Sequence, residues 1–160
     1  MAAPGQAQRH LAGSTSFMSG PLRVFLDSNI VFSAARDTRS ELQNLWLLPA
    51  VDILLSQYVL EEVGGHLVHP DQRAALWKLV YRSHLVPDPE PIPLPDKVDL
   101  PEKDQPILQA AIASKAHILV TGDKRHFGPL FGQTVLGVRI ESTSVFKNRY
   151  PEIFRREQKQ

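Results

Sequence analysis

The stretch HILVTGD, residues 117–123, is an apolar run that ends in Thr-Gly-Asp. A short apolar run bounded by turn residues predicts a buried strand. The stretch LRVFLD, residues 22–27, has the same form and also ends in an acid. Ligands of open parallel sheets collect beyond the carboxyl ends of the strands. We therefore expect Asp27 and Asp123 to lie together at one edge of a sheet.

Stretches with strand and helix character alternate along the rest of the chain. Further strands are predicted at 52–55, 84–86 and 135–140, and helices at 30–35, 40–48, 57–67, 70–80, 102–115 and 144–147. Strands that alternate with helices form parallel sheets whose two faces are both covered. The sequence therefore predicts an α/β fold with a central parallel sheet of about five strands.

Length and composition limit the class of protein. The chain has 160 residues, which is enough for one domain with one core, and its 42% apolar content is ordinary for a globular protein. We expect a leader without fixed structure at 1–20, a folded domain at 21–150 and a polar tail at 151–160. No apolar run approaches the roughly 20 residues that span a membrane. The absence of cysteine excludes disulfides and thiolate metal sites, and it fits a reducing, cytoplasmic compartment.

Two further acids, Glu62 and Asp104, lie in stretches with helical spacing. Taken singly, Asp27 suits a strand-ending turn, Glu62 a solvated helix face and Asp104 a helix N-terminus. Carboxylates that converge repel one another unless a cation neutralises them, and hard oxygen ligands favour Mg²⁺ or Mn²⁺. The four acids together indicate a metal-dependent enzyme acting on phosphate esters.

Four short motifs resemble, in this order, those of the PIN domain family: LDSNI at 26–30, LEEV at 60–63, KDQPILQAA at 103–111 and LVTGDK at 119–124. The resemblance covers about residues 22–146. It implies a three-layer α/β/α fold and a Mg²⁺- or Mn²⁺-dependent endoribonuclease that hydrolyses RNA. Many bacterial members are VapC-type toxins, each paired with an antitoxin protein, so the resemblance also implies such a partner and a homodimer.

The motifs assign the acidic, metal-binding quartet to Asp27, Glu62, Asp104 and Asp123. Glu61 competes for the second position, and the spacing to the apolar residue that follows favours Glu62. Many family members carry another acid two residues after the last Asp, where this chain has Arg125. That change weakens a second metal site and leaves open whether one or two ions bind.

The resemblance gives the neighbouring polar residues two readings each. Asn29 and Thr121 either position water or phosphate at the site or cap local turns. The basic run Lys124, Arg125 and His126 either binds RNA phosphates or forms a solvated loop. In the hydrolysis that the family performs, Glu62 would bind a second ion or orient the attacking water.

A non-catalytic alternative remains, in which a PIN scaffold binds RNA or a partner protein without cleaving. An Asp-x-Asp phosphatase is disfavoured because Asn29 stands where the second acid is needed. His117 is expected to be partly buried, and Trp46 and Trp77 to lie in the core or a dimer interface. The helices around 42–48 and 76–80 are predicted to supply that interface.

Overall fold

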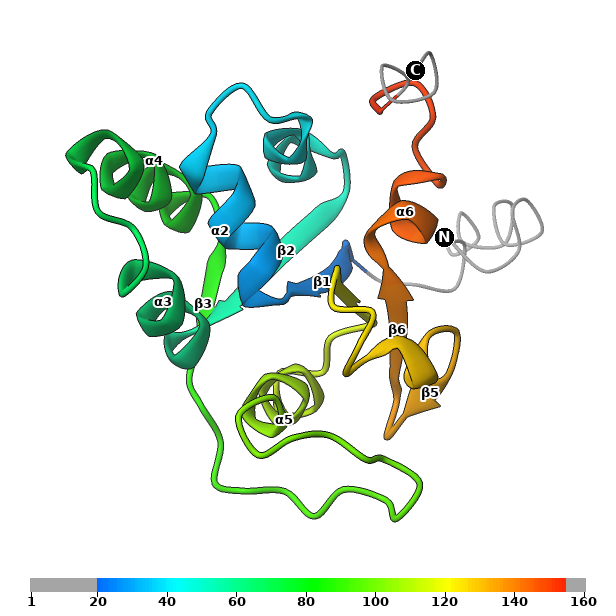
Figure 1. The fold of residues 1–160 in the computed structure, drawn as a ribbon. Coiled ribbons are helices and arrows are strands. Elements are labelled where there is room, and N and C mark those ends of the chain that lie inside the picture. The colour runs from blue at the N-terminus through cyan, green and yellow to red at the C-terminus, as the bar shows by residue number, and fades with distance from the viewer. Residues whose placement is uncertain (1–19, 155–160) are drawn as a thin grey trace, which may run out of the picture.

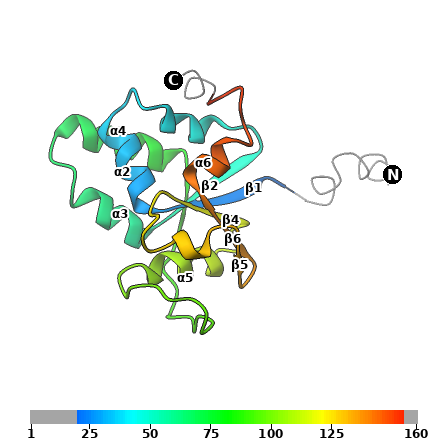
Figure 2. The same cartoon turned by 45° about the vertical axis from the view of Figure 1, so that its right-hand side comes forward.

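The computed structural model describes residues 20–154, which form one six-stranded sheet with helices on both faces (Figures 1 and 2). The strand order is β3-β2-β1-β4-β6-β5. The strands are β1 (Leu22–Leu26), β2 (Val51–Ser56), β3 (His84–Val86), β4 (Ile118–Thr121), β5 (Thr134–Val135) and β6 (Val138–Ser142). Residues 1–19 of the predicted leader lie outside the described part of the chain, as do residues 155–160 of the predicted tail.

The helices complete the three layers predicted from the sequence. They are α2 (Ser28–Arg36), the 3₁₀ helix η2 (Glu41–Leu47), α3 (Gln57–Gly64), α4 (Pro70–Tyr81), α5 (Gln105–Ala113), the 3₁₀ turn η3 (Gly128–Leu130) and α6 (Thr143–Lys147). Figure 1 shows α2, α3 and α4 on one side of the sheet and α5 on the other. The predicted α/β class is confirmed.

The two apolar runs that end in acids are neighbours at the centre of the sheet. β1 and β4 pair in parallel, with Leu26 opposite Val120, and the backbone N–H of Asp27 donates to the Val120 carbonyl at 3.0 Å. Phe25, Leu26 and Val120 are completely buried, because helices cover both faces of these strands. The register therefore brings the acid after each strand to the same edge.

The final strand differs from the prediction. Residues 135–140 were expected to form one strand, whereas β5 and β6 are separate and antiparallel. Leu136 and Gly137 have φ angles of 47° and 92° and form the two-residue turn between them. Tight hairpin turns need positive φ, which favours Gly or Asn. A leucine in this conformation gave the sequence no turn signal, so the hairpin was missed. The other five strands form the parallel sheet as predicted.

Helix starts follow the expected chemistry, with one informative exception. The hydroxyl groups of Ser40 and Ser56 accept hydrogen bonds from backbone N–H groups in the first turns of η2 and α3, as N-caps do. The segment after Ser40 is 3₁₀ rather than α-helical. Asp104 occupies the N-cap position of α5, yet its side chain makes no capping hydrogen bond. Its carboxylate is therefore directed elsewhere.

Three aromatic or imidazole side chains test the expected burial. Trp46 is buried and donates from Nε1 to Ser83 Oγ at 2.8 Å, whereas Trp77 is 64% exposed. His117 was predicted to be partly buried and is instead exposed; it directly precedes β4, and its Nδ1 accepts a hydrogen bond from the backbone N–H of Arg23. Phe154 packs into the core, so the folded region continues beyond the predicted boundary at 150.

Within residues 20–154, no helix combines the length and the apolar character needed to cross a bilayer.

Candidate functional site

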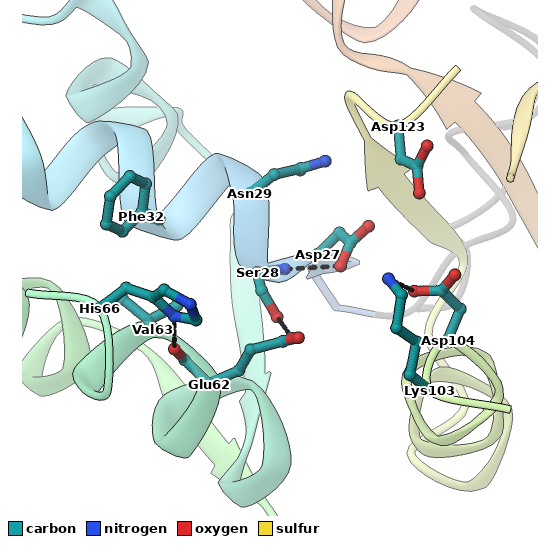
Figure 3. A pocket seen from close by; sticks show the side chains of 10 residues that line it. All are labelled: Asp27, Ser28, Asn29, Phe32, Glu62, Val63, His66, Lys103, Asp104 and Asp123. Carbon is teal, nitrogen blue, oxygen red and sulfur yellow. Dashed lines mark hydrogen bonds and ion pairs between the residues drawn. The ribbon is translucent and has the colours of Figure 1, made fainter. Parts of the chain in front are cut away.

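A cavity of about 250 Å³ opens beyond the carboxyl ends of β1 and β4. It is lined by Asp27, Ser28, Asn29, Phe32, Glu62, Val63, His66, Lys103, Asp104 and Asp123. All four acids predicted from the sequence are therefore at one cavity. Figure 3 shows Asp27, Asp104 and Asp123 around a common space, with Glu62 reaching in from α3. The four residues come from four separate segments of the chain and meet only through the fold.

Asp27 lies at the floor of the cavity and is 5% exposed. Its Oδ1 accepts a hydrogen bond from the Ser28 backbone N–H at 2.6 Å, and its Oδ2 accepts one from Thr121 Oγ1 at 2.6 Å. Burial raises the pKa of Asp27 from its ordinary value of 3.8 to about 6; the two hydrogen bonds oppose this rise, and the charges of Asp104 and Glu62 add to it. Ionising Asp27 in this buried position therefore costs free energy, and a bound cation would lower that cost.

Asp104, Asp123 and His126 form a tight cluster beside Asp27. His126 Nδ1 lies 3.0 Å from Asp104 Oδ2 and 3.0 Å from Asp123 Oδ2. The contact with Asp123 has hydrogen-bond geometry. The contact with Asp104 does not: among the described residues, the buried Asp104 Oδ2 has no hydrogen-bond partner despite the short distance. A ring nitrogen bonds along one direction only, and that of His126 Nδ1 is taken up by Asp123.

Glu62 approaches from the opposite wall. Its Oε1 accepts a hydrogen bond from Ser28 Oγ at 2.5 Å, which fixes the carboxylate at the cavity. Glu61 instead is exposed, accepts a hydrogen bond from Gln57 and lines a different hollow on the α3–α4 surface. The structure thus places Glu62 and not Glu61 at the cavity, which agrees with the choice made from the spacing.

The four predicted substrate-binding residues differ in their burial and in their position relative to the cavity. Asn29 is exposed at the cavity, and its Oδ1 accepts a hydrogen bond from the Gly122 backbone N–H at 3.3 Å. Thr121 is fully buried; its hydroxyl donates to Asp27 and accepts from the Asp123 backbone N–H at 3.0 Å. The bond to the Asp123 backbone is the local contact of the turn-capping reading, whereas the bond to Asp27 joins two segments that are 94 residues apart in the sequence. Lys124 and Arg125 are exposed and do not line the cavity; each lines a separate hollow.

Sequence reasoning missed three residues at this site. His126 was grouped with the basic run, although its place three residues after Asp123 is the spacing of one tight turn and could have indicated contact with that acid. Lys103 precedes Asp104, and its Nζ lies 3.4 Å from Asp104 Oδ1. Ser28 holds Glu62. Nothing in the sequence pairs Ser28 with Glu62, since the two are 34 residues apart.

The donor set fits a hard divalent cation. It contains several carboxylate oxygens and one imidazole nitrogen, and Asp104, Asp123 and His126 each offer an atom within 4.8 Å of the others. The unpaired oxygen of Asp104 is the structural sign of such a ligand, because a buried carboxylate oxygen without a partner is costly. Mg²⁺ and Mn²⁺ prefer these ligands.

Comparison with solved structures identifies the fold. The chain superposes on a chain of VapBC2 from Rickettsia felis bound to a DNA fragment from their promoter, with a TM-score of 0.55 and 20% sequence identity. It also superposes on a chain of DNA-bound VapBC from Salmonella typhimurium, with a TM-score of 0.54 and 17% identity. Each alignment covers 76% of this chain and 98% of the other.

A scan against protein-family models finds no match, and a search of curated protein sequences finds none either. At 17–20% identity the structural likeness establishes the fold and not the activity. The chain has a VapC-like PIN-domain fold. The resemblance inferred from the four sequence motifs is therefore confirmed at the level of the fold.

Proposed function

We propose that this protein is a Mg²⁺- or Mn²⁺-dependent endoribonuclease that hydrolyses RNA phosphodiesters. One observation carries the proposal: Asp27, Glu62, Asp104 and Asp123 meet at one open cavity at the carboxyl edge of the sheet. Sites of open α/β sheets lie at this edge. Crowded carboxylates on a PIN-like fold suit a cation and the phosphate esters that cations activate.

The cation would be held by Asp27, Asp104 and Asp123, with Glu62 close enough to orient water. When bound, such an ion makes water a better nucleophile and stabilises charge on the leaving oxygen. Thr121 contributes by fixing the Asp27 carboxylate and, through its hydroxyl, the backbone of Asp123. The proton that Asp27 holds up to a pH of about 6 must leave before this residue can act as a ligand.

Basic residues around the cavity offset its repulsion of RNA. Lys103 lies on the rim, and its side chain is 63% exposed. Lys124 and Arg125 directly follow Asp123 in the chain, and both are exposed. We propose that these three side chains contact RNA phosphates while Asn29 faces the bound strand. Phosphate contacts of this kind position a nucleic acid without reading its sequence.

The two superposed chains belong to VapBC complexes, which supports a toxin role for this chain and an antitoxin protein as its partner. We also propose a cytoplasmic location and a homodimer. Trp77, Tyr81 and Leu85 are exposed on α4 and β3 and supply apolar area for a dimer interface. Sedimentation of the wild type and of Trp77→Ser tests the dimer; a monomeric wild type would rule it out.

Cleavage of labelled RNA tests the enzymatic proposal. Structured and single-stranded RNAs are incubated with Mg²⁺, Mn²⁺ or EDTA, using wild type, Glu62→Gln and Glu61→Gln. We expect metal-dependent cleavage by wild type and Glu61→Gln, with a large loss in Glu62→Gln, because only Glu62 lines the cavity. RNA binding without cleavage in any metal would favour the scaffold alternative that Arg125 raises.

A further inference from the structure

We propose that His126 Nδ1 is a direct ligand of the divalent cation, together with Asp104 and Asp123, and that this nitrogen makes the site prefer Mn²⁺ to Mg²⁺. The inference rests on the proposed metal site, and it concerns the identity of the ion rather than the RNA chemistry. Neither the quartet of acids nor the four sequence motifs assigns a role in metal binding to this histidine.

His126 lies at short distances from two carboxylates. His126 Nδ1 is 3.0 Å from an oxygen of each of two carboxylates that belong to different segments of the chain. Adjacent ligands around an octahedral ion with bonds of about 2.1 Å are separated by about 3.0 Å. The nitrogen is therefore already at the spacing of a neighbouring ligand from each of the two oxygens.

One carboxylate oxygen of Asp104 is buried without a hydrogen bond. Asp104 is 6% exposed, and its Oδ2 has no hydrogen-bond partner among residues 20–154. An imidazole Nδ1 has one in-plane bonding direction, so it cannot bond well to Asp104 and Asp123 at once. A cation accepts electron pairs from all three atoms at once and removes the cost of the unpaired oxygen.

His126 is held in place by the fold. Its backbone N–H donates to Asp123 Oδ1 at 3.0 Å, which closes the turn that starts at Asp123. The next residue, Phe127, is completely buried, and its backbone N–H donates to the Asp123 carbonyl at 3.1 Å. The imidazole is thus fixed beside the two acids, as metal ligands usually are.

The consequence for the ion follows from ligand chemistry. Carboxylates and water suit both Mg²⁺ and Mn²⁺, but Mn²⁺ is the transition-metal ion of the two and accepts an imidazole nitrogen that Mg²⁺ uses poorly. A structural alternative is that His126 serves only to hydrogen-bond the acids. In that case the ion would be coordinated by oxygen alone and would show no preference due to His126.

Pulsed electron paramagnetic resonance of the Mn²⁺-loaded protein separates these possibilities. We expect electron spin echo modulation from a directly bound ¹⁴N, replaced by the ¹⁵N pattern in protein labelled with ¹⁵N-histidine. The modulation should disappear in His126→Ala and persist in His66→Ala, the matched control, because His66 lines the cavity but bonds through Nδ1 to the Glu62 carbonyl.

Competition titrations give the second readout. The ratio of Mn²⁺ to Mg²⁺ affinity should fall about tenfold or more in His126→Ala and stay unchanged in His66→Ala, as expected for the loss of one nitrogen ligand. Mn²⁺ binding without nitrogen modulation would overturn the inference and leave the proposed function standing. The absence of Mn²⁺ and Mg²⁺ binding would overturn both. Labelled wild type shows whether any histidine binds the ion even if a variant does not fold, and His66→Ala with unchanged modulation excludes the other histidine of the cavity.

Discussion

Two regions of the molecule bury carboxylates and neutralise them differently. Glu141 on β6 is 1% exposed, and it receives Arg139 Nε at 2.9 Å and a charged hydrogen bond from Arg149. Asp27 and Asp104 are nearly as deeply buried, at 5% and 6% exposed. Asp27 is held by uncharged donors, and Asp104 keeps one oxygen without a hydrogen bond among the described residues.

The comparison shows that the partners of a buried acid indicate its role. Burying a charge is expensive unless it is paired. Glu141 has its cations built into the chain, so its role is structural. The acids of the cavity lack an arginine partner among residues 20–154. Lys103 and His126 contact Asp104 and Asp123, but Asp27 and Glu62 have no cationic partner there, which leaves negative charge that an ion from solution can balance. Glu141 on β6 pairs across the sheet with Val120 on β4, the strand that Asp123 follows. The two kinds of buried acid therefore belong to neighbouring parts of the same sheet.

The largest expected effect is on cleavage. Asp27→Asn and Asp123→Asn should each lower RNA cleavage by about 10³-fold or more, since loss of a metal ligand removes several kcal/mol of transition-state stabilisation. Glu141→Gln should retain cleavage while folded. Initial rates with labelled RNA measure all three, and equal losses in the three variants would remove the distinction between the two regions.

The second effect is on the metal-free fold. In the folded state Asp27 ionises near pH 6, whereas it ionises at 3.8 when unfolded. Between these values the unfolded chain binds fewer protons, so stability falls as pH rises and the full cost is present above pH 6. The separation corresponds to about 3 kcal/mol. Asp27→Asn should therefore be more stable than wild type in EDTA at pH 7.5, by up to about this amount.

Urea unfolding across pH checks the sign of this effect. The advantage of Asp27→Asn should shrink as the pH falls toward 4 and vanish below about pH 3, where Asp27 is protonated in both states of the wild type. A variant that is less stable than wild type at pH 7.5 would contradict the account.

The third effect should have the opposite sign. Glu141→Gln should destabilise the protein by about 2 kcal/mol, because the three hydrogen bonds from Arg139 and Arg149 lose their charged acceptor while the arginines, 43–47% exposed, regain water. Urea unfolding with and without Mn²⁺ measures this change. The loss should be the same in both conditions, and a loss that appears only with Mn²⁺ would place Glu141 in the metal site.

The fourth effect concerns pH and metal affinity. Because Asp27 holds its proton up to a pH of about 6, Mn²⁺ affinity should fall by about tenfold per pH unit below that value. Calorimetric titrations at pH 7.5, 6 and 5 measure the fall. Affinity that is constant over this range would show that Asp27 does not contact the ion.

The smallest effect concerns RNA binding. Arg125→Ala should weaken binding a few-fold and reduce the salt slope by about one, as expected for one lost phosphate contact. Arg39→Ala is the matched control, since Arg39 is highly exposed on the loop after α2 and pairs with Asp37. Filter binding at several salt concentrations distinguishes the two, and equal slopes would assign Arg125 to a solvated loop.

Local patterns made most of the fold predictable. The runs before Asp27 and Asp123 are mainly apolar, as is typical of strands that are covered on both faces. The N-caps Ser40 and Ser56 mark the starts of two helices directly. The β5–β6 hairpin was not predicted, because its turn depends on the positive φ of Leu136, which the residue type does not reveal.

The site was only partly predictable, for a different reason. The four acids follow from motif positions, but their catalytic roles remain predictions. The roles of Ser28, Thr121 and His126 depend on contacts that only the fold creates, and Thr121 meets Asp27 across 94 residues of sequence. A residue's type indicates its chemistry, whereas its partner in space decides whether that chemistry is used for positioning, for pairing or for a ligand.

The most direct test of the central claim is calorimetric titration of Mn²⁺ into wild type, Asp104→Asn and Glu141→Gln at pH 7.5. The account predicts binding by wild type and by folded Glu141→Gln, with a loss of about tenfold or more in Asp104→Asn. Binding that survives unchanged in Asp104→Asn, or that is absent from wild type, would show that the Asp104 oxygen without a hydrogen bond is not a ligand of a cation.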